Sequence, residues 1–341
     1  MAHPFEYVSP RSTARIFRWS LAVCIITVLS GVPSCAKKAV DKGDDPSDNP
    51  YAKITVADFP TMTIDRGNPC LKEYKLNNVE ALANEYYANN LQWVFGCGVN
   101  WKILDENYVP VLYEIPGVVT RNMNQICHFA FGFYKYYHES GDERYRTYFF
   151  NNVHWLMDYA DKNGYLLYTY KWTHTSLVYN EPWVSGMAQG EAVAVMCMAY
   201  RISGEKKYLD MARLMFERMY SNTGGRWIFG VDTEGYYWLE EYPGPDFCHV
   251  LNGKLIGLWG LWDYYVITRD AFALTLFQAG IKSVIDHLPD YKISGTHLSR
   301  YCMHYNTSNQ SYHQIHLDLF KYYDQFFHIP EFNVAPFFFA Q

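Results

Sequence analysis

The sequence has no run of basic residues and no cysteine pair at metal-binding spacing. Its 341 residues carry a net charge of −6 and no nucleic-acid-binding motif, so nucleic acid is not an expected partner. None of the eight cysteines forms a C-x-x-C pair, which argues against a zinc or thiol-redox motif. His313 and His316 lie three residues apart on an aromatic segment, a pattern more often structural than metal-binding. We therefore expect no metal and no cofactor.

The sequence also lacks an apolar run that would cross a membrane comfortably. Three arginines precede an apolar stretch at 19–32, which is shorter than a membrane span. The residues that follow resemble a bacterial lipoprotein signal with Cys35 as the lipidated residue. They predict an exported protein tethered to the membrane, in the periplasm or at the cell surface, with an uncleaved signal anchor as the alternative. The predicted segments are a signal peptide at 1–34, a disordered tether at 35–50 and one folded domain at 51–341.

Aromatic residues, in contrast, are abundant. The chain has 31 tyrosines and 10 tryptophans. Aromatic side chains with a polar tip commonly line sugar-binding grooves, because the ring stacks on a sugar face and the tip forms hydrogen bonds. For any one of these residues, an aromatic-rich helical core is the alternative interpretation.

Six cysteines follow the signal segment. Cys127 and Cys197 fall inside apolar helical runs, and we expect both to be buried. A bond between Cys70 and Cys97 is compatible with an oxidising compartment, but the sequence does not determine the disulfide pairing.

A short polar sequence motif, which we call a polar word, separates two helical runs at three places along the chain. The words are Ser140-Gly141-Asp142, Ser203-Gly204-Glu205 and Thr268-Arg269-Asp270, at intervals of 63 and 65 residues. A recurrence at this interval indicates a repeated helix pair.

The two helices of a pair differ in pattern. Residues 183–202 are apolar almost all round, which is typical of a helix covered on every side. Residues 206–219 place apolar side chains on one stripe, which is typical of a half-exposed outer helix. The same alternation recurs at 255–262 with 272–285, and less regularly at 129–137 with 145–159.

Buried helices that alternate with amphipathic ones predict a mainly α-helical fold. We expect an incomplete (α/α) toroid, in which inner helices ring an axis and outer helices wrap them. An ordinary α-solenoid is the alternative. Alternating apolar and polar residues at 51–70 predict in addition a short N-terminal β segment.

Chemically active side chains gather where loops enter the predicted inner helices. Such loops commonly carry binding and catalytic residues, although caps and turns use the same residue types. Three of these groups are the short motifs, or words, Ser185-Gly186-Met187-Ala188-Gln189-Gly190, Glu240-Glu241-Tyr242-Pro243 and Asn252-Gly253. A fourth group precedes the last helix and consists of His297, Arg300, Asn306 and Tyr312-His313.

Together these words resemble the catalytic domain of the D-glucuronyl C5-epimerases, which convert glucuronate to iduronate within heparan sulfate and heparosan. The resemblance covers roughly residues 180–320. It implies that Tyr242, His297, Arg300, Tyr312 and Glu241 are catalytic. It implies that the substrate is bound by Ser185, Gly186, Met187, Ala188, Gln189, Asn252, Asn306 and His313.

The chain departs from this family at two points. The family carries a catalytic tyrosine where this chain has His297, three residues before the matching arginine. The identity of the second proton carrier is therefore open. The large β-rich domain that precedes the helices in animal members is also expected to be missing, because few residues separate the predicted tether from the first helix.

The chemistry of epimerisation explains these residue types. Removing the hydrogen on carbon 5 of a hexuronate builds charge on the adjacent carboxylate, which a cation must stabilise, and Arg300 suits a carboxylate geometrically. Tyr242, Tyr312 and His297 could take and return the proton on opposite faces, and histidine titrates nearest to neutrality. Our hypothesis pairs His297 with one of the two tyrosines. Glu241 could accept a proton or a sugar hydroxyl.

Three other functions remain open. A uronate polysaccharide lyase shares the first proton abstraction and then expels the group at carbon 4. A glycoside hydrolase could pair Glu240 or Glu241 with Asp232 or Asp246. A non-catalytic glycan-binding lipoprotein would keep the groove without turnover. In each case the expected partner is an anionic, uronate-containing polysaccharide, a glycosaminoglycan in the favoured case, and the resemblance also implies a homodimer.

Overall fold

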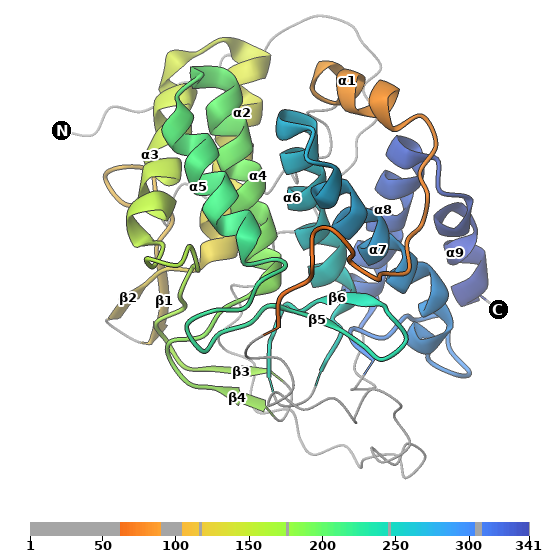
Figure 1. The fold of residues 1–341 in the computed structure, drawn as a ribbon. Coiled ribbons are helices and arrows are strands. Elements are labelled where there is room, and N and C mark those ends of the chain that lie inside the picture. Colours follow the sequence, from red (N-terminus) through yellow and green to blue (C-terminus); the bar gives the residue numbers. More distant parts are fainter. Residues whose placement is uncertain are drawn as a thin grey trace, which may run out of the picture.

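Helices form most of this computed structural model, which describes residues 62–89, 104–115, 118–174, 177–244, 247–303 and 309–340. After helix α1 (Val79–Asn89), the chain forms consecutive helix pairs (Figure 1). The pairs are α2 (Met123–Ser140) with α3 (Glu143–Tyr159), α4 (Gly186–Ser203) with α5 (Lys206–Glu217), α6 (Leu251–Thr268) with α7 (Ala271–Asp286), and α8 (Gln310–Phe327) with α9 (Pro330–Ala340). A 3-10 turn, η4 (Leu288–Tyr291), follows α7.

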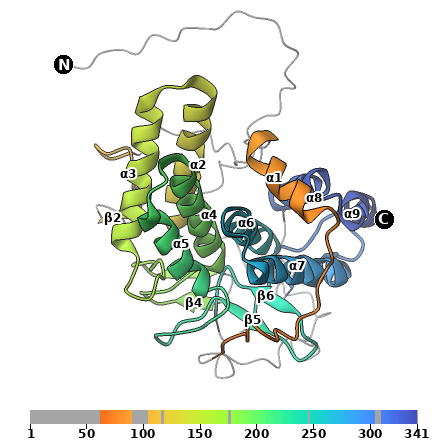
Figure 2. The same ribbon diagram turned by 45° about the horizontal axis from the view of Figure 1, so that its top comes forward.

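The first helix of each pair lies toward the centre of the fold. Helix α4 packs against both α2 and α6, and α6 packs against α8, whereas α3, α5, α7 and α9 pack mainly on their own partners (Figure 2). Helix α4 is buried from Gly186 to Ala199, and α6 from Leu251 to Tyr265. Helix α5 buries only one stripe of side chains. The predicted alternation of inner and outer helices is confirmed, and with it the incomplete (α/α) toroid.

The polar words between paired helices form the same cap three times. In each word a serine or threonine hydroxyl donates to the carbonyl four residues earlier and accepts from the amide two residues later. The intervening residue is left-handed: Gly141, Gly204 or Arg269, with φ of 68°, 71° and 56°. A left-handed residue ends a helix by satisfying its last carbonyls. The sequence repeat is therefore a repeat of one chain reversal.

A two-stranded hairpin precedes each of three inner helices. The hairpins are β1 (Leu112–Ile115) with β2 (Val118–Thr120), β3 (Trp172–His174) with β4 (Leu177–Tyr179), and β5 (Phe229–Val231) with β6 (Tyr237–Leu239). They lie at one end of the helices (Figure 1). In the described part of the predicted β segment, 62–70, the backbone pairing is one bridge between Thr63 and Ser221. The sequence did not predict the hairpins, because strands of three or four residues are too short to display an alternation of apolar and polar residues.

Glycines bring α4 and α6 into backbone contact. A Cβ on Gly190 would collide with the carbonyl of Gly257, and a Cβ on Gly260 would collide with the carbonyl of Gly190. This close approach also joins the loops that enter the two helices, because the Gly186 amide donates to the Glu240 carbonyl over 2.7 Å. The glycines of the sequence words therefore position the loops by packing.

Several predictions fall on residues that the structure does not describe. They include the signal peptide, the tether, Cys97, Asp246 and Asn306. Within the described ranges, no helix has the length and apolar character of a membrane span. Cys127 and Cys197 are buried, as predicted, and Cys70 is an exposed thiol. A disulfide joins Cys248 to Cys302.

Candidate active site

Two adjacent glutamates follow β6 and point to opposite sides of the chain. Successive side chains of an extended segment alternate between two faces. Glu240 is fully buried and bonded to His249, and Glu241 is 7% exposed on the other face. The Glu241 carboxyl rests against the first turn of α6, where a Cβ on Gly253 would collide with it. The Asn252-Gly253 word thus supplies the space that Glu241 occupies.

Two tyrosine hydroxyls bond to the Glu241 carboxyl, and a third tyrosine bonds to one of them. The Tyr301 hydroxyl donates to Glu241 Oε2 over 3.5 Å, and the Tyr242 hydroxyl also forms a hydrogen bond with Glu241. The hydroxyl of Tyr301 forms further hydrogen bonds with those of Tyr242 and Tyr312. The rings of Tyr301 and Tyr312 meet edge to face, with centroids 4.4 Å apart. We call Glu241, Tyr242, Tyr301 and Tyr312 the tyrosine cluster.

The environment of the tyrosine cluster favours its protonated forms. The pKa of Glu241 is raised to about 8, chiefly by burial and also by the nearby Glu191 and Glu240 carboxyls, although hydrogen bonds from Tyr242 and Tyr301 act to lower it. Burial also raises the pKa of Tyr312 to about 12. The pKa values of Tyr242 and Tyr301 lie well above the usual value, first because of burial and then because of Glu241. Glu241 therefore titrates closest to neutral pH within the cluster.

The Cys248–Cys302 disulfide joins the two chain segments that carry the tyrosine cluster. Cys248 lies between Tyr242 and α6, and Cys302 directly follows Tyr301. Backbone hydrogen bonds reinforce the link, from Met303 to the Cys248 carbonyl and from Leu251 to the Tyr301 carbonyl, both at 3.0 Å. The disulfide, with Val250 and Tyr301, forms a small apolar core against which Tyr242 and Tyr312 pack.

An aromatic wall continues from Tyr242 toward the next inner helix. Tyr179 and Trp183 lie with ring centroids 5.8 and 6.0 Å from Tyr242. Trp183 stacks on Tyr168 at 4.0 Å. The Tyr179 hydroxyl donates to the Tyr242 carbonyl over 3.2 Å, which ties the loop before α6 to hairpin β3–β4.

A second buried carboxyl, Glu191 of α4, lies close enough to influence Glu241. Glu191 is 2% exposed, and it accepts a hydrogen bond from Asn124 Nδ2 over 2.7 Å and lies 2.6 Å from His128 Nε2. Burial lowers the pKa of His128, but Glu191 more than offsets this, so the pKa lies above its usual value. The Tyr168 hydroxyl donates to Asn124 and links this pair to the aromatic wall.

His297 and Arg300 are the other two predicted catalytic residues, and His313 is a predicted binding residue; each has contacts of its own. His297 is exposed, with Nε2 at 3.0 Å from Gln310 Oε1. Arg300 is half-buried, its amide donates to the Tyr291 carbonyl over 2.6 Å, and its Nε donates to the Lys292 carbonyl over 3.3 Å. His313 is buried, with Nδ1 at 3.0 Å from Ser299 Oγ.

The predicted binding word that opens α4 serves as a cap and a packing surface. The Ser185 hydroxyl accepts from the Ala188 amide, and Gly186 packs on the Glu240 carbonyl. Gln189 is buried, and its amide donates to the carbonyls of Gly164 and Met215. Met187 and Asn252 are also buried. Direct contact with a substrate stays a prediction for these residues and for His313.

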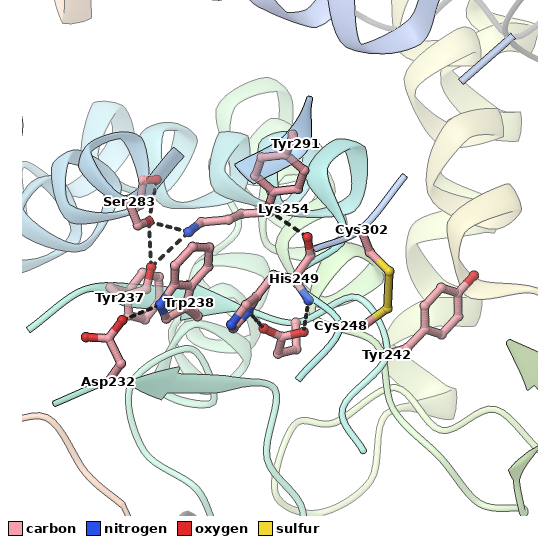
Figure 3. A network of polar contacts seen from close by, with 12 residues as sticks. Asp232, Tyr237, Trp238, Tyr242, Cys248, His249, Lys254, Ser283, Tyr291 and Cys302 are labelled. Carbon is pink, nitrogen blue, oxygen red and sulfur yellow. Dashed lines mark hydrogen bonds and ion pairs between the residues drawn. A yellow bond between two sulfur atoms is a disulfide. The ribbon is translucent and has the colours of Figure 1, made fainter. Parts of the chain in front are cut away.

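A polar network fills the core on the Glu240 side (Figure 3). The Glu240 carboxyl accepts from the backbone amide of His249 over 3.1 Å and is bonded to His249 Nδ1. The Lys254 ammonium donates to Ser283 and to the Tyr237 carbonyl, and it lies 3.8 Å above the Trp238 ring. Burial holds the pKa of Lys254 well below its usual value. In the view of Figure 3, the disulfide lies between His249 and Tyr242.

The sequence analysis did not identify three residues of the candidate site and one disulfide. They are Tyr301, Glu191, His128 and the Cys248–Cys302 pair. Tyr301 and Glu191 carried a usable signal, because each directly follows a residue of the quoted words, Arg300 or Gly190. The disulfide carried none, because its two cysteines are 54 positions apart. Among the described residues, no group of three or more His, Cys, Asp or Glu side chains could hold a metal ion.

Known proteins resemble this chain over its C-terminal half. A family model for the D-glucuronyl C5-epimerase C-terminus matches residues 160–334. A D-glucuronyl C5-epimerase from Caenorhabditis elegans is 30% identical over 164 residues, which are 43% of this chain and 26% of the relative. An uncharacterized protein from Methanocaldococcus jannaschii is 25% identical over 176 residues, 47% of this chain and 57% of the relative. The aligned regions thus span about a quarter and somewhat over half of these two relatives.

Solved structures resemble the chain at lower sequence identity. A family 76 α-mannanase from Bacteroides thetaiotaomicron aligns with a TM-score of 0.48 and 13% identity, covering 77% of this chain and 70% of that one. A cellobiose 2-epimerase from Bacillus thermoamylovorans aligns with a TM-score of 0.45 and 15% identity, covering 66% and 61%.

Proposed function

The chain belongs to the family of the D-glucuronyl C5-epimerase C-terminus, and from this premise we propose that it is a polysaccharide epimerase. It inverts carbon 5 of D-glucuronate to L-iduronate within a heparosan- or heparan-type chain. The observation that carries the proposal is the tyrosine cluster, in which one buried carboxyl with a pKa of about 8 is bonded to tyrosine hydroxyls.

Glu241 supplies the base through Tyr242. A general base works best when its pKa is close to the working pH, and a tyrosine with a raised pKa is a poor base alone. When Glu241 is ionised, it can accept the Tyr242 proton while Tyr242 takes the hydrogen from carbon 5. The electron pair of the broken carbon–hydrogen bond then moves toward the carboxylate of the sugar.

Tyr312 returns a proton on the opposite face. Tyr242 and Tyr312 are only partly buried, and they belong to different chain segments that meet at the Cys248–Cys302 disulfide. The sequence-based hypothesis paired a tyrosine with His297. We favour Tyr312 over His297 because the tyrosine shares the cluster of Glu241, whereas His297 is exposed and bonded to Gln310.

Arg300 stabilises the charge that develops on the substrate carboxylate. Its backbone hydrogen bond to Tyr291 and its Nε bond to Lys292 fix the base of the side chain, and a guanidinium matches a carboxylate in a two-pronged arrangement. The N-terminal ends of α2, α4 and α6 also face the hairpin end, where their dipoles favour an anionic ligand.

Proton NMR of heparosan incubated with the protein in deuterium oxide tests the proposal. We expect iduronate signals together with loss of the carbon 5 proton signal, because the returned proton comes from solvent-exchanged groups. An unsaturated product that absorbs in the ultraviolet would instead assign a lyase. Binding of heparosan without isotope exchange would assign a glycan-binding protein.

We also propose that the protein works outside the cytoplasm. The support is the N-terminal sequence alone, with its basic segment, apolar stretch and Cys35. Mass spectrometry of the protein from membranes would detect the lipid on Cys35. Its absence, with an intact N-terminus, would contradict the lipoprotein assignment. A homodimer stays an expectation from the family resemblance.

A further inference from the structure

In the proposed reaction one tyrosine removes the carbon 5 proton and another returns one, so the protonation states of the site after a turnover differ from those at its start. At the start Glu241 is ionised, and Tyr242 and Tyr312 both carry protons. Tyr242 takes the carbon 5 proton and passes its own to Glu241, and Tyr312 then gives its proton to carbon 5 from the other face. After inversion Glu241 is protonated and Tyr312 is a phenolate. One proton must return from Glu241 to Tyr312 before the next turnover.

Tyr301 lies on the path that this proton would take. Its hydroxyl is 3.5 Å from Glu241 Oε2 and is hydrogen-bonded to Tyr312. The two rings meet edge to face at 4.4 Å, so Tyr301 is in contact with both the group that gains a proton and the group that loses one.

Tyr301 is also more buried than its two tyrosine neighbours, and its backbone is fixed. It is 7% exposed, whereas Tyr242 and Tyr312 are only partly buried. The adjacent disulfide and the hydrogen bond between its carbonyl and the Leu251 amide fix its backbone. A buried hydroxyl between two partly exposed ones suits a relay that does not touch the substrate.

We propose that Tyr301 is a proton relay that resets the enzyme between turnovers by passing the proton of Glu241 to the Tyr312 phenolate. Tyr301 donates its own hydroxyl proton to Tyr312 and accepts the proton of Glu241. This restores the carboxylate of Glu241 and leaves all three tyrosines protonated. Tyr301 is thus a positioning residue that acts through Glu241 and Tyr312. The inference rests on the proposed epimerase function.

The test compares the first turnover with later ones in Tyr301→Phe, by rapid quench and iduronate analysis. Phenylalanine keeps the ring packing against Tyr312 and removes only the hydroxyl. We expect the first turnover to stay within about threefold of wild type and the steady-state rate to fall on the order of a hundredfold. The variant should therefore show a burst of about one product per site.

Buffer rescue separates a slow reset from slow product release or a folding defect. Small buffer molecules can carry the proton to Tyr312, which is only partly buried, so a higher buffer concentration at constant pH should raise the steady-state rate of Tyr301→Phe but not of wild type. Tyr323→Phe is the matched control, because it removes a buried hydroxyl that donates to the Leu255 carbonyl outside the cluster. It should behave like wild type.

The outcomes distinguish the relay from the function on which it rests. Wild type that forms no iduronate would sink the proposed function itself. Active wild type with an unchanged Tyr301→Phe would overturn only the relay. The relay is equally excluded if Tyr301→Phe slows all turnovers alike and buffer does not restore the rate, because the hydroxyl would then act in the chemical step or in the packing.

Discussion

Glu240 and Glu241 are neighbours in sequence, yet the fold gives them opposite environments. Glu240 is fully buried and accepts hydrogen bonds from the backbone and ring of one histidine, His249. Glu241 faces tyrosine hydroxyls on the other side of the chain, and its pKa is raised to about 8, first by burial. A buried carboxyl that accepts several hydrogen bonds stabilises the core. A buried carboxyl whose named partners are phenols keeps a raised pKa and can exchange protons near neutral pH.

The reactivity of these two carboxyls depends on their partners more than on their burial. Both side chains are almost inaccessible to solvent. The Glu240 side contains a lysine, a histidine and a serine in one network, and the Glu241 side contains phenols on chain segments that a disulfide joins. Substitutions of Glu241 should therefore lower activity, and substitutions of Glu240 should lower stability.

Glu241→Gln should cause the largest loss of activity. The amide cannot accept the Tyr242 proton, so we expect kcat to fall on the order of a thousandfold, within the range for loss of a general base. Stability should not fall, because the variant removes a buried acid whose ionisation opposes folding. Isotope exchange into heparosan measures the rate, and a rate within tenfold of wild type would remove Glu241 from the mechanism.

Glu240→Ala should instead cause the largest loss of stability. It leaves the His249 amide and ring donors without their acceptor inside the core, at a cost of about 3–5 kcal/mol in the free energy of unfolding. Urea unfolding measures this cost. Glu240→Gln is the matched control, since it keeps one acceptor oxygen and should lose less. Equal stability of Glu240→Ala and wild type would show that the network is not structural.

Arg300→Ala should lower kcat/KM on the order of a hundredfold, the effect of deleting one group that stabilises a developing oxyanion. Arg300→Lys keeps the charge without the fork and should recover only part of the loss. Both values come from initial rates on heparosan. A near-wild-type rate for Arg300→Ala would place the carboxylate clamp on another residue.

The pH dependence should follow the titration of Glu241. A base must be ionised, so kcat/KM should rise about tenfold per pH unit and level off near pH 8. The same raised pKa lowers stability as the pH rises from about 4.5 to about 8, because the unfolded chain releases that proton first. A flat rate profile between pH 6 and 8 would contradict the assignment of Glu241 as the base.

His297→Ala should have the smallest effect, within about threefold of the wild-type rate, because an exposed side chain outside the cluster contributes little to proton transfer. Deuterium incorporation at carbon 5 measures it. Loss of exchange comparable to that of Glu241→Gln would restore the sequence-based pair of His297 and a tyrosine.

The helix pairs could be predicted from sequence because their signals are local and repeated. Residues 206–219 display an apolar stripe, and the polar words mark each chain reversal by hydrogen bonds within a few residues. Hairpin β5–β6 has strands of only three residues, too few to display a period. Its position before α6 nevertheless directs Glu240 and Glu241 to opposite sides.

The sequence by itself determined the inner and outer helices, the Glu241-Tyr242 motif and the family of the chain. These depend on short-range patterns and on which residues stand in a motif. Only the tertiary structure brought Tyr301 to Glu241, 60 positions away, and Glu191 to His128. Such contacts depend on how α4 and α6 meet through their glycines and how a disulfide joins two loops. A carboxyl acquires its pKa from neighbours that the chain order does not reveal.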